Sequence, residues 1–284
     1  MPYAESKNTR LYYEDSGKGP PIVFVHEFSG DLRSWEGQIR HFSRRYRCVA
    51  FNARGYPPSD VPTSWTKYSQ AIATDDIAAV MRHLGLRKAH IIGCSMGAAA
   101  TLHFGLHHPQ MALSLTLIGA GSGSDPKKRR AFLRNTEIRA REFETLPLRE
   151  IAKTYRTAPN RVQLLRKDPR AWREFWVRFC EHSGPGHANT LRGIQARRPS
   201  LYSLERKLHR LQVPLHVITG DEDENALDAG LFIKRCCAAA RLSVVPATGH
   251  VVNLEEPAYF NRITDEFLAL VESRRWRPRS NIEK

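Results

Sequence analysis

Short apolar stretches recur along the chain and predict the strands of a sheet. The central ones are nearly continuous apolar runs, whereas a strand with one solvent-facing side alternates between apolar and polar residues. Continuous runs are typical of strands covered on both faces, as in a mostly parallel sheet with helices on either side. The runs are residues 11–13, 22–25, 48–51, 89–92, 113–118, 215–219 and 242–245.

Segments with helical periodicity lie between these runs. Apolar side chains recur at helical spacing in residues 69–84, and this segment ends at Gly85. Residues 96–107 are small and Ala-rich, which suits a helix packed closely on a sheet, and residues 257–271 form a third candidate helix. Strands and helices alternate, which predicts an α/β fold with a mostly parallel, doubly wound sheet of about eight strands.

The alternation stops between about residues 125 and 211. This stretch has no strong strand candidate, and its Arg- and aromatic-rich helical segments are divided by six prolines. The simplest interpretation is a helical insertion after the sixth strand, over the carboxyl-terminal edge of the sheet. We therefore expect a core formed by residues 1–122 and 212–284, and an inserted helical unit formed by residues 123–211.

A G-x-S-x-G motif, Gly93-Cys94-Ser95-Met96-Gly97, joins a predicted strand to a predicted helix. In this context the motif predicts a sharp turn that holds a serine hydroxyl above the sheet at a helix N-terminus. Free backbone N–H groups and the helix dipole favour negative charge at that point. Ser95 is therefore the candidate nucleophile; the alternative is a serine that only caps the helix.

A serine hydroxyl is a weak nucleophile without a base, and the chain contains 12 histidines. His250 is the best candidate, because it follows the predicted strand 242–245 and a glycine-containing loop. A carboxylate is then needed to orient the imidazole and to stabilise its charged form. Two candidates, Asp221 and Asp223, follow the predicted strand 215–219.

These motifs and their order resemble the α/β-hydrolase superfamily over nearly the whole chain. The segment Phe24 to Gly30 looks like the family's His-Gly oxyanion loop, and the segment Phe51 to Asp60 looks like its Asp-x-Arg-Gly-x-Gly-x-Ser segment. The resemblance favours Asp223 over Asp221, because Gly220 to Asp223 matches the family's Gly-x-x-Asp. It also identifies the inserted helical unit with the cap domain that covers the pocket in many members.

The resemblance further implies an oxyanion hole made by the backbone N–H groups of Phe28 and Met96. His26 lies in the same loop as Phe28, and it is a candidate for supporting the loop or the pocket. Glu27 departs from the family pattern, which has glycine there, and Asn52 and Pro58 replace the family's Asp and Gly. We expect Glu27 to tie the loop down rather than to face the substrate, because an unpaired anion would oppose oxyanion stabilisation.

Four aromatic residues of the cap, Trp172, Phe175, Trp176 and Phe179, follow helical i, i+3, i+4, i+7 spacing. This spacing places them on one apolar stripe of a helix. We expect the stripe to pack on the core. Trp172 and Trp176 are candidates for lining the pocket.

Basic residues give the chain a net charge of +15 and are concentrated in one segment. Residues 121–210 contain 22 Lys and Arg against 9 Asp and Glu. The segment is either an ordinary charged helical surface or a site that attracts an acidic substrate or an acidic carrier protein. Nucleic-acid binding is not expected, because the segment contains no helix-turn-helix, zinc-finger or RNA-recognition signature.

The rest of the composition points to a cytoplasmic protein. The N-terminus lacks the features of a secretory signal, and no window approaches the roughly 18 apolar residues of a membrane span. The five cysteines have no C-x-x-C spacing, so neither a disulfide framework nor a metal site is expected.

The candidate residues predict a serine hydrolase that cleaves a small carboxylic ester through an acyl-enzyme on Ser95, without a cofactor. The same machinery suits a lactonase or a carbon–carbon bond hydrolase. A ligand-binding, receptor-like protein with little turnover is the alternative from another class, and binding alone does not require the set Ser95, Asp223 and His250.

Overall fold

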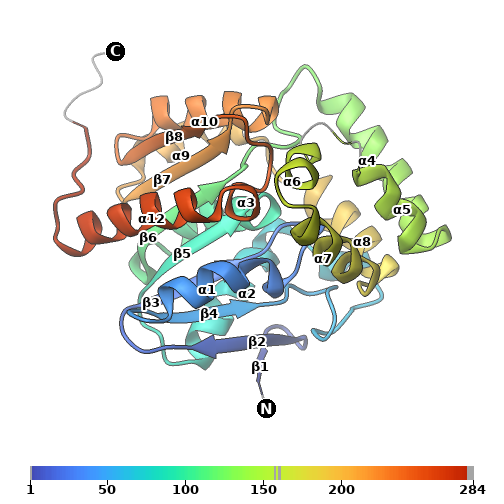
Figure 1. Cartoon of the computed structure of the whole chain (residues 1–284), viewed down its shortest axis with the longest axis horizontal. Coiled ribbons are helices and arrows are strands. Elements are labelled where there is room, and N and C mark those ends of the chain that lie inside the picture. The colour runs from blue at the N-terminus through green and yellow to red at the C-terminus, as the bar shows by residue number, and fades with distance from the viewer. Residues whose placement is uncertain (1, 157, 159–160, 280–284) are drawn as a thin grey trace.

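The computed structural model describes residues 2–156, 158 and 161–279. Its centre is one sheet with the strand order β1-β2-β4-β3-β5-β6-β7-β8 (Figure 1). The strands β1 and β2 pair antiparallel with their neighbours, and the strands from β4 to β8 in this order are parallel. The strands are β1 Tyr3–Glu5, β2 Arg10–Ser16, β3 Pro21–Val25, β4 Arg47–Phe51, β5 Ala89–Cys94, β6 Ala112–Ile118, β7 Leu215–Gly220 and β8 Ala240–Val245.

Helices cover both faces of the sheet, which explains why the central strands are apolar on both sides. Val23, Ile91 and Val217 point to the face covered by α2, α3 and α10, whereas Phe24 and Ile92 point to the face covered by α1 and α12. The helices of the core are η1 Leu32–Trp35, α1 Glu36–Phe42, η2 Trp65–Lys67, α2 Gln70–His83, α3 Met96–His107, η3 Pro109–Met111, α10 Glu224–Cys236, α11 Val252–Glu255 and α12 Pro257–Glu272.

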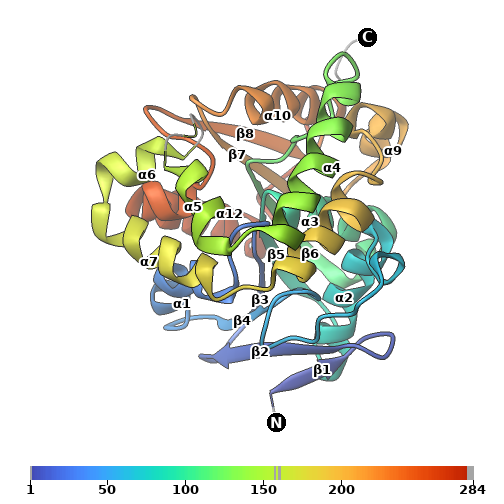
Figure 2. The same cartoon turned by 90° about the vertical axis from the view of Figure 1, so that its right-hand side faces the viewer.

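The chain between β6 and β7 is helical and lies over one end of the sheet (Figure 2). It has a small apolar core of its own, formed by residues such as Phe143, Ile151 and Phe179. We propose that residues 123–211 form the cap domain and that residues 1–122 and 212–284 form the core domain. The helices of this region are α4 Arg129–Thr145, α5 Leu148–Tyr155, α6 Val162–Lys167, α7 Pro169–Cys180, α8 Gly184–Thr190, the π-helix η4 Leu191–Gln195, η5 Leu201–Leu204 and α9 Glu205–Arg210.

The predicted α/β class, the mostly parallel sheet and the helical insertion after the sixth strand are confirmed. The sequence pattern did not predict β1, α1 or α10. None of the described helices is long and apolar enough to cross a membrane. The parallel strands all point their carboxyl ends toward the cap, so the loops that follow β3, β5, β7 and β8 meet beneath it.

Candidate active site

Ser95 lies at the sharp turn between β5 and α3. Its backbone has φ 53° and ψ −107°, a region that non-glycine residues rarely adopt. The glycines of the motif make the turn possible, because a Cβ on Gly93 would lie 2.4 Å from the carbonyl oxygen of Gly97. A Cβ on Gly97 would lie 2.1 Å from the carbonyl oxygen of Val25. The motif thus lets α3 start against β3 with the serine hydroxyl partly exposed above the sheet.

The structure brings Ser95, His250 and Asp223 together in one chain of hydrogen bonds. The Oγ atom of Ser95 lies 2.7 Å from Nε2 of His250, and Nδ1 of His250 contacts the carboxylate of Asp223. In the neutral imidazole, Nδ1–H donates to the carboxylate and Nε2 accepts from the serine hydroxyl. His250 and Asp223 are 7% and 5% exposed, so this series of hydrogen bonds is shielded from water except at the serine.

Asp221, the other candidate acid, lies in a different environment. It is exposed, and its carboxylate accepts a 3.1 Å hydrogen bond from the backbone N–H of Thr248. Asp221 therefore supports the loop that carries His250 and does not contact the imidazole. The structure separates the two candidates that the sequence had left close together.

Glu255 on α11 also supports this loop, and no sequence motif indicates this role. Its two carboxylate oxygens accept hydrogen bonds from the N–H groups of Gly249, at 2.6 Å, and Val251, at 3.2 Å. These two residues flank His250 on both sides. Burial raises the pKa of Glu255. Its partners are backbone amides, so no side-chain pattern in the sequence marks its role.

The expected oxyanion donors are the N–H groups of Phe28, in the loop after β3, and Met96, directly after Ser95. Met96 is the first residue of α3, where backbone N–H groups have no acceptor within the helix. The carbonyl of Phe28 accepts a 2.7 Å hydrogen bond from the hydroxyl of Tyr56, which fixes the peptide that follows it. Both amides are main-chain groups, so they are positioned before any charge develops.

His26 holds the loop that carries Phe28. Its Nε2 atom accepts a 3.0 Å hydrogen bond from the N–H of Ala53, so its Nδ1–H is the donor in the 2.7 Å bond to the carbonyl of Glu27. Burial lowers the pKa of His26, which keeps the ring neutral in this arrangement. The structure therefore gives His26 a supporting place in the loop.

Glu27 points away from solvent and binds Arg161 of the cap. The guanidinium of Arg161 contacts both carboxylate oxygens, and the two side chains are 5% and 2% exposed. The hydroxyl of Ser29 donates to the carboxylate at 2.9 Å. Burial alone raises the pKa of Glu27, but Arg161 outweighs this effect and holds that pKa below its ordinary value. Glu27 is thus paired, as a residue that ties the loop down would be.

The aromatic stripe of α7 divides between two environments. Trp172 and Phe175 pack into the core layer below the cap, and Phe179 is buried in the cap's own core. Trp172 and Trp176 also line a solvent-facing groove of about 560 Å³. The triad residues are not part of the groove lining; the lining residues are Ala152, Lys153, Arg156, Leu165, Pro169, Trp172, Arg173 and Trp176.

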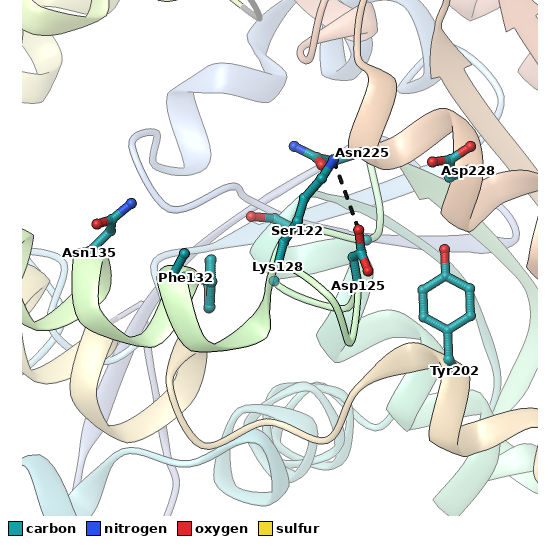
Figure 3. Close-up of a pocket in the computed structure, with 11 residues that line it drawn as sticks. Ser122, Asp125, Lys128, Phe132, Asn135, Tyr202, Asn225 and Asp228 are labelled. Carbon is teal, nitrogen blue, oxygen red and sulfur yellow. Dashed lines mark ion pairs between the residues drawn. The ribbon is translucent and has the colours of Figure 1, made fainter.

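A second pocket, of about 300 Å³, lies where the cap meets the carboxyl ends of β6 and β7 (Figure 3). Phe132 of α4 and Tyr202 supply aromatic walls, and Asn225 lies two residues after Asp223. Asp125 and Lys128 form an ion pair at its edge, at 3.9 Å. This pocket therefore borders the segment that carries Asp223.

Cys94 is next to Ser95 in the motif but is a poor candidate for the nucleophile. It ends β5 and is 1% exposed, with its side chain in the apolar layer that also contains Ile92 and Ile118. Burial raises the pKa of its thiol well above the ordinary value, so the reactive thiolate is disfavoured.

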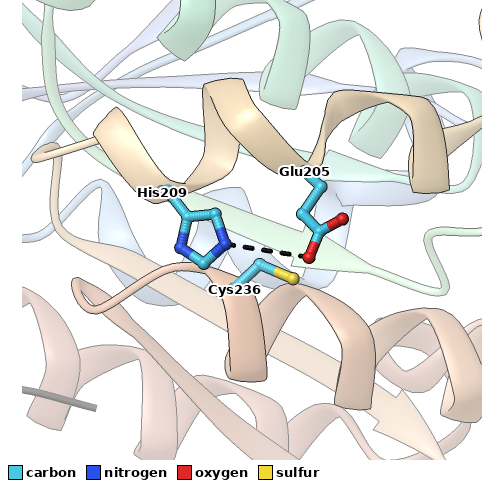
Figure 4. A group of neighbouring side chains, drawn as sticks. All are labelled: Glu205, His209 and Cys236. Carbon is cyan, nitrogen blue, oxygen red and sulfur yellow. Dashed lines mark ion pairs between the residues drawn. The ribbon is translucent and has the colours of Figure 1, made fainter. Parts of the chain in front are cut away.

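Among the described residues, one group of side chains has donor atoms close enough to share a metal ion. Atoms of Glu205, His209 and Cys236 lie within 4.8 Å of one another (Figure 4). Glu205 and His209 are exposed on α9, and Cys236 ends α10, so the group lies toward the amino ends of β7 and β8. Ser95 lies at the opposite edge of the sheet. This group therefore takes no part in the chemistry proposed for Ser95.

Comparisons with known proteins agree with this geometry. Residues 20–257 match the model of the alpha/beta hydrolase fold family. This match covers most of the chain. The chain belongs to the α/β-hydrolase fold family. It is a hydrolase of this family, and a small molecule is its expected substrate class.

Individual relatives cover the chain almost completely but differ in what they do. A Bacillus subtilis protein proposed to be a 2-succinyl-6-hydroxy-2,4-cyclohexadiene-1-carboxylate synthase is 26% identical over 91% of this chain and 95% of its own. A 2-hydroxy-6-oxononadienedioate/2-hydroxy-6-oxononatrienedioate hydrolase of Comamonas testosteroni is 26% identical over 92% of both chains. The 3-oxoadipate enol-lactonase 1 of Acinetobacter baylyi is 22% identical over 94% of this chain and 96% of its own.

A solved structure shows the same fold. A carboxylesterase from Nitrososphaera gargenis superposes with a TM-score of 0.85 at 21% identity, covering 96% of this chain and all of that one. At this level of identity the likeness concerns the fold. The substrate must be argued from the site.

Proposed function

We propose that the protein is a serine hydrolase that cleaves a small carboxylic ester through an acyl-enzyme on Ser95. The observation that carries the proposal is the 2.7 Å contact between Oγ of Ser95 and Nε2 of His250, with Asp223 on the far side of the ring. A nucleophile, a base and an orienting acid in this order are what acyl transfer requires. The positive φ of Ser95 supports the proposal, because a nucleophilic serine at a sharp strand-to-helix turn has such a strained backbone.

Each of these residues has its own role in the proposed reaction. His250 takes the proton of Ser95 as the hydroxyl attacks the carbonyl, and Asp223 stabilises the imidazolium. The N–H groups of Phe28 and Met96 then hold the oxyanion of the tetrahedral intermediate. His250 gives its proton to the leaving alcohol and afterwards takes a proton from the water that attacks the acyl-enzyme. It returns this proton to Oγ of Ser95 as the bond to the acyl group breaks and the acid is released.

A lactonase is the second candidate, and the full-length match to an enol-lactonase supports it. A lactone is a cyclic ester, so the same residues would perform the same steps with the alcohol still attached to the acyl group. The match to a hydrolase of 2-hydroxy-6-oxo-dienedioates supports carbon–carbon bond cleavage as a third candidate. That reaction needs in addition a proton delivered to the carbon that leaves.

One experiment tests the proposal and separates these candidates. The wild-type chain and Ser95→Ala are compared on p-nitrophenyl esters, lactones and vinylogous diketones, and both are treated with a fluorophosphonate probe. We expect stoichiometric labelling and turnover of small esters by the wild type, both abolished by Ser95→Ala. A folded wild-type protein that is not labelled would point instead to a ligand-binding protein. Turnover of diketones alone would support the carbon–carbon hydrolase.

The solvent-facing groove lined by Trp172 and Trp176, which we name the cap groove, is the place we propose for an acidic substrate group or an acidic carrier protein. Trp172 and Trp176 form its apolar wall, and Lys153, Arg156 and Arg173 lie exposed around it. An apolar chain with an acidic end, or an acidic protein that carries an acyl group, is complementary to this combination.

A further inference from the structure

The carboxylate of Glu27 and the guanidinium of Arg161 join two segments that lie 134 positions apart in the chain. Glu27 directly precedes Phe28, whose N–H is one of the two proposed oxyanion donors. Arg161 precedes α6 in the cap. The pair is therefore a buried connection between the cap and the loop that must hold the oxyanion.

The peptide between Glu27 and Phe28 is held from several directions. Its carbonyl accepts hydrogen bonds from Nδ1 of His26, at 2.7 Å, and from the N–H of Gly30, at 3.3 Å. The side chain of Glu27 is held by Arg161, which also donates to the hydroxyl of Ser29 at 2.7 Å. Without Arg161 the loop would keep its backbone contacts but lose the anchor of its only buried carboxylate within residues 26–30.

Arg161 itself has little freedom. Its guanidinium carbon lies 5.1 Å from the ring centre of Phe175 and 5.8 Å from that of Tyr155, so aromatic rings of the cap surround it. An arginine fork matches a carboxylate with two parallel hydrogen bonds, which fixes orientation as well as distance. The orientation of the Glu27 carboxylate therefore depends on where the cap places Arg161.

The rest of this cap segment contacts the other two catalytic loops. Gln163 donates to the carboxylate of Glu222, beside Asp223, at 2.6 Å. Lys167 donates to the hydroxyl of Thr248, two residues before His250, at 3.1 Å. Residues 161–167, which we name the cap bridge, thus touch the oxyanion loop, the acid loop and the histidine loop.

We propose that Glu27 and Arg161 are positioning residues, which fix the Phe28 amide for the oxyanion and neutralise a carboxylate that would otherwise oppose it. This inference rests on the proposed function of Ser95. It predicts that losing Arg161 alone lowers activity more than losing both charges. Loss of Arg161 leaves a free carboxylate beside the developing oxyanion, whereas loss of both charges removes only the anchor.

The test compares Arg161→Met, Glu27→Gln and the double variant on a small ester, at a temperature where each is folded by circular dichroism. We expect kcat to fall about 100-fold in Arg161→Met, since misplacement by about 1 Å can cost that much. KM should change less than about threefold. The double variant should be about tenfold more active than Arg161→Met, because it lacks the unpaired carboxylate.

A boronic acid that forms a tetrahedral adduct on Ser95 gives a second readout. Its inhibition constant should weaken in step with the loss of kcat/KM in each variant, because the adduct needs the same oxyanion donors. The conservative variant Arg161→Lys keeps the charge but loses the fork, so its kcat should lie between those of the wild type and Arg161→Met. If Arg161→Met does not fold, the Lys and double variants still decide the question.

A matched control is available in the core. Asp76 and Arg54 form another buried ion pair, with side chains 2% and 1% exposed, and within the described residues neither side chain hydrogen-bonds to residues 26–30. Asp76→Asn should lower the melting temperature but leave kcat of the folded protein within about threefold. The inference is overturned if Arg161→Met keeps kcat within threefold, or if the double variant is less active than Arg161→Met. Fluorophosphonate labelling of Ser95 in every variant shows separately that the proposed hydrolase chemistry stands.

Discussion

The core and the cap differ in their buried acidic side chains, because among the described residues the cap has none. In the core, the carboxylates of Asp223 and Glu255 are each 5% exposed and bind one catalytic loop. In the cap, most acidic residues form exposed pairs one helical turn apart, and pairs of this kind contribute little to stability. Examples are Arg139–Glu142, Arg141–Glu137, Lys153–Glu150 and Arg170–Glu174.

Three cap arginines depart from this pattern because they point inward. Arg161 binds Glu27, Arg129 donates to the carbonyls of Gly123 and Ala196, and Arg198 donates to the carbonyl of Ser122. Burial lowers the pKa of Arg198 to about 10. The formal charge of the cap therefore overstates the charge on its surface. The carboxylate of the proposed triad thus lies in the core, whereas the cap's charges either hold loops or face solvent.

The largest expected effect tests the place of the chemistry in the core. Asp223→Asn keeps the shape of the side chain but favours the wrong tautomer of His250, so kcat should fall about 10⁴-fold. Asp221→Asn loses only a carboxylate that accepts from Thr248, so its kcat should fall less than about tenfold. Steady-state kinetics on one p-nitrophenyl ester measure both. Equal losses in the two variants would show that the acid has been misassigned.

The sequence brought Ser95 and His250 forward as candidates because each follows a strand that its apolar run predicts. The same argument fitted both Asp221 and Asp223, and only the resemblance to the family favoured Asp223. Parallel strands bring their carboxyl ends to the same edge, so residues far apart in the chain meet there without further information. The short strand β1 was missed because three residues carry too little periodicity to predict a strand. The helix α10 was missed because its acidic start was interpreted only as a source of catalytic carboxylates.

Glu255 and Arg161 could not be predicted in this way. Glu255 binds backbone N–H groups, which nearly all residue types have, so the residue types around it do not indicate its partners. Arg161 is one of 22 basic residues between positions 121 and 210. What distinguishes it is burial against Phe175 and contact with Glu27, and both depend on how the cap docks on the core. Glu27 was noticed because it departs from the family pattern, but its partner was not.

Acid tests the role of a buried histidine of the core. His216 in β7 accepts or donates one hydrogen bond, with Ser243, and burial lowers its pKa to about 4. Between pH 6.5 and 4 the unfolded chain binds a proton at this residue that the folded chain does not. Stability therefore falls as the pH falls through this window, by on the order of 2–3 kcal/mol for His216. Urea unfolding at a series of pH values should show a shallower acid slope in His216→Asn.

The exposed histidine His209 in the cap is the control for this measurement. Its side chain is 55% exposed, so His209→Asn removes no buried imidazole and should leave the acid slope unchanged. If the His216 and His209 variants behave alike, acid sensitivity arises elsewhere, for example at the buried His187 of the cap, whose pKa burial also lowers. A slope that remains steep in His216→Asn would assign the effect to other buried groups such as His103, whose pKa burial also lowers to about 4.

The smallest expected effect concerns the surface charge of the cap. Arg156 and Arg173 are exposed at the cap groove, and among the described residues neither forms an ion pair. Replacing both with Ser should change kcat/KM for a neutral ester less than about twofold. For an ester that carries a carboxylate, kcat/KM should fall about three- to tenfold at low ionic strength, and the difference should vanish at high salt, because screening removes long-range attraction. The double variant Arg87→Ser/Lys88→Ser removes the same charge from exposed positions of the core before β5. If it lowers kcat/KM for the anionic ester equally, total charge and not the cap groove attracts the substrate.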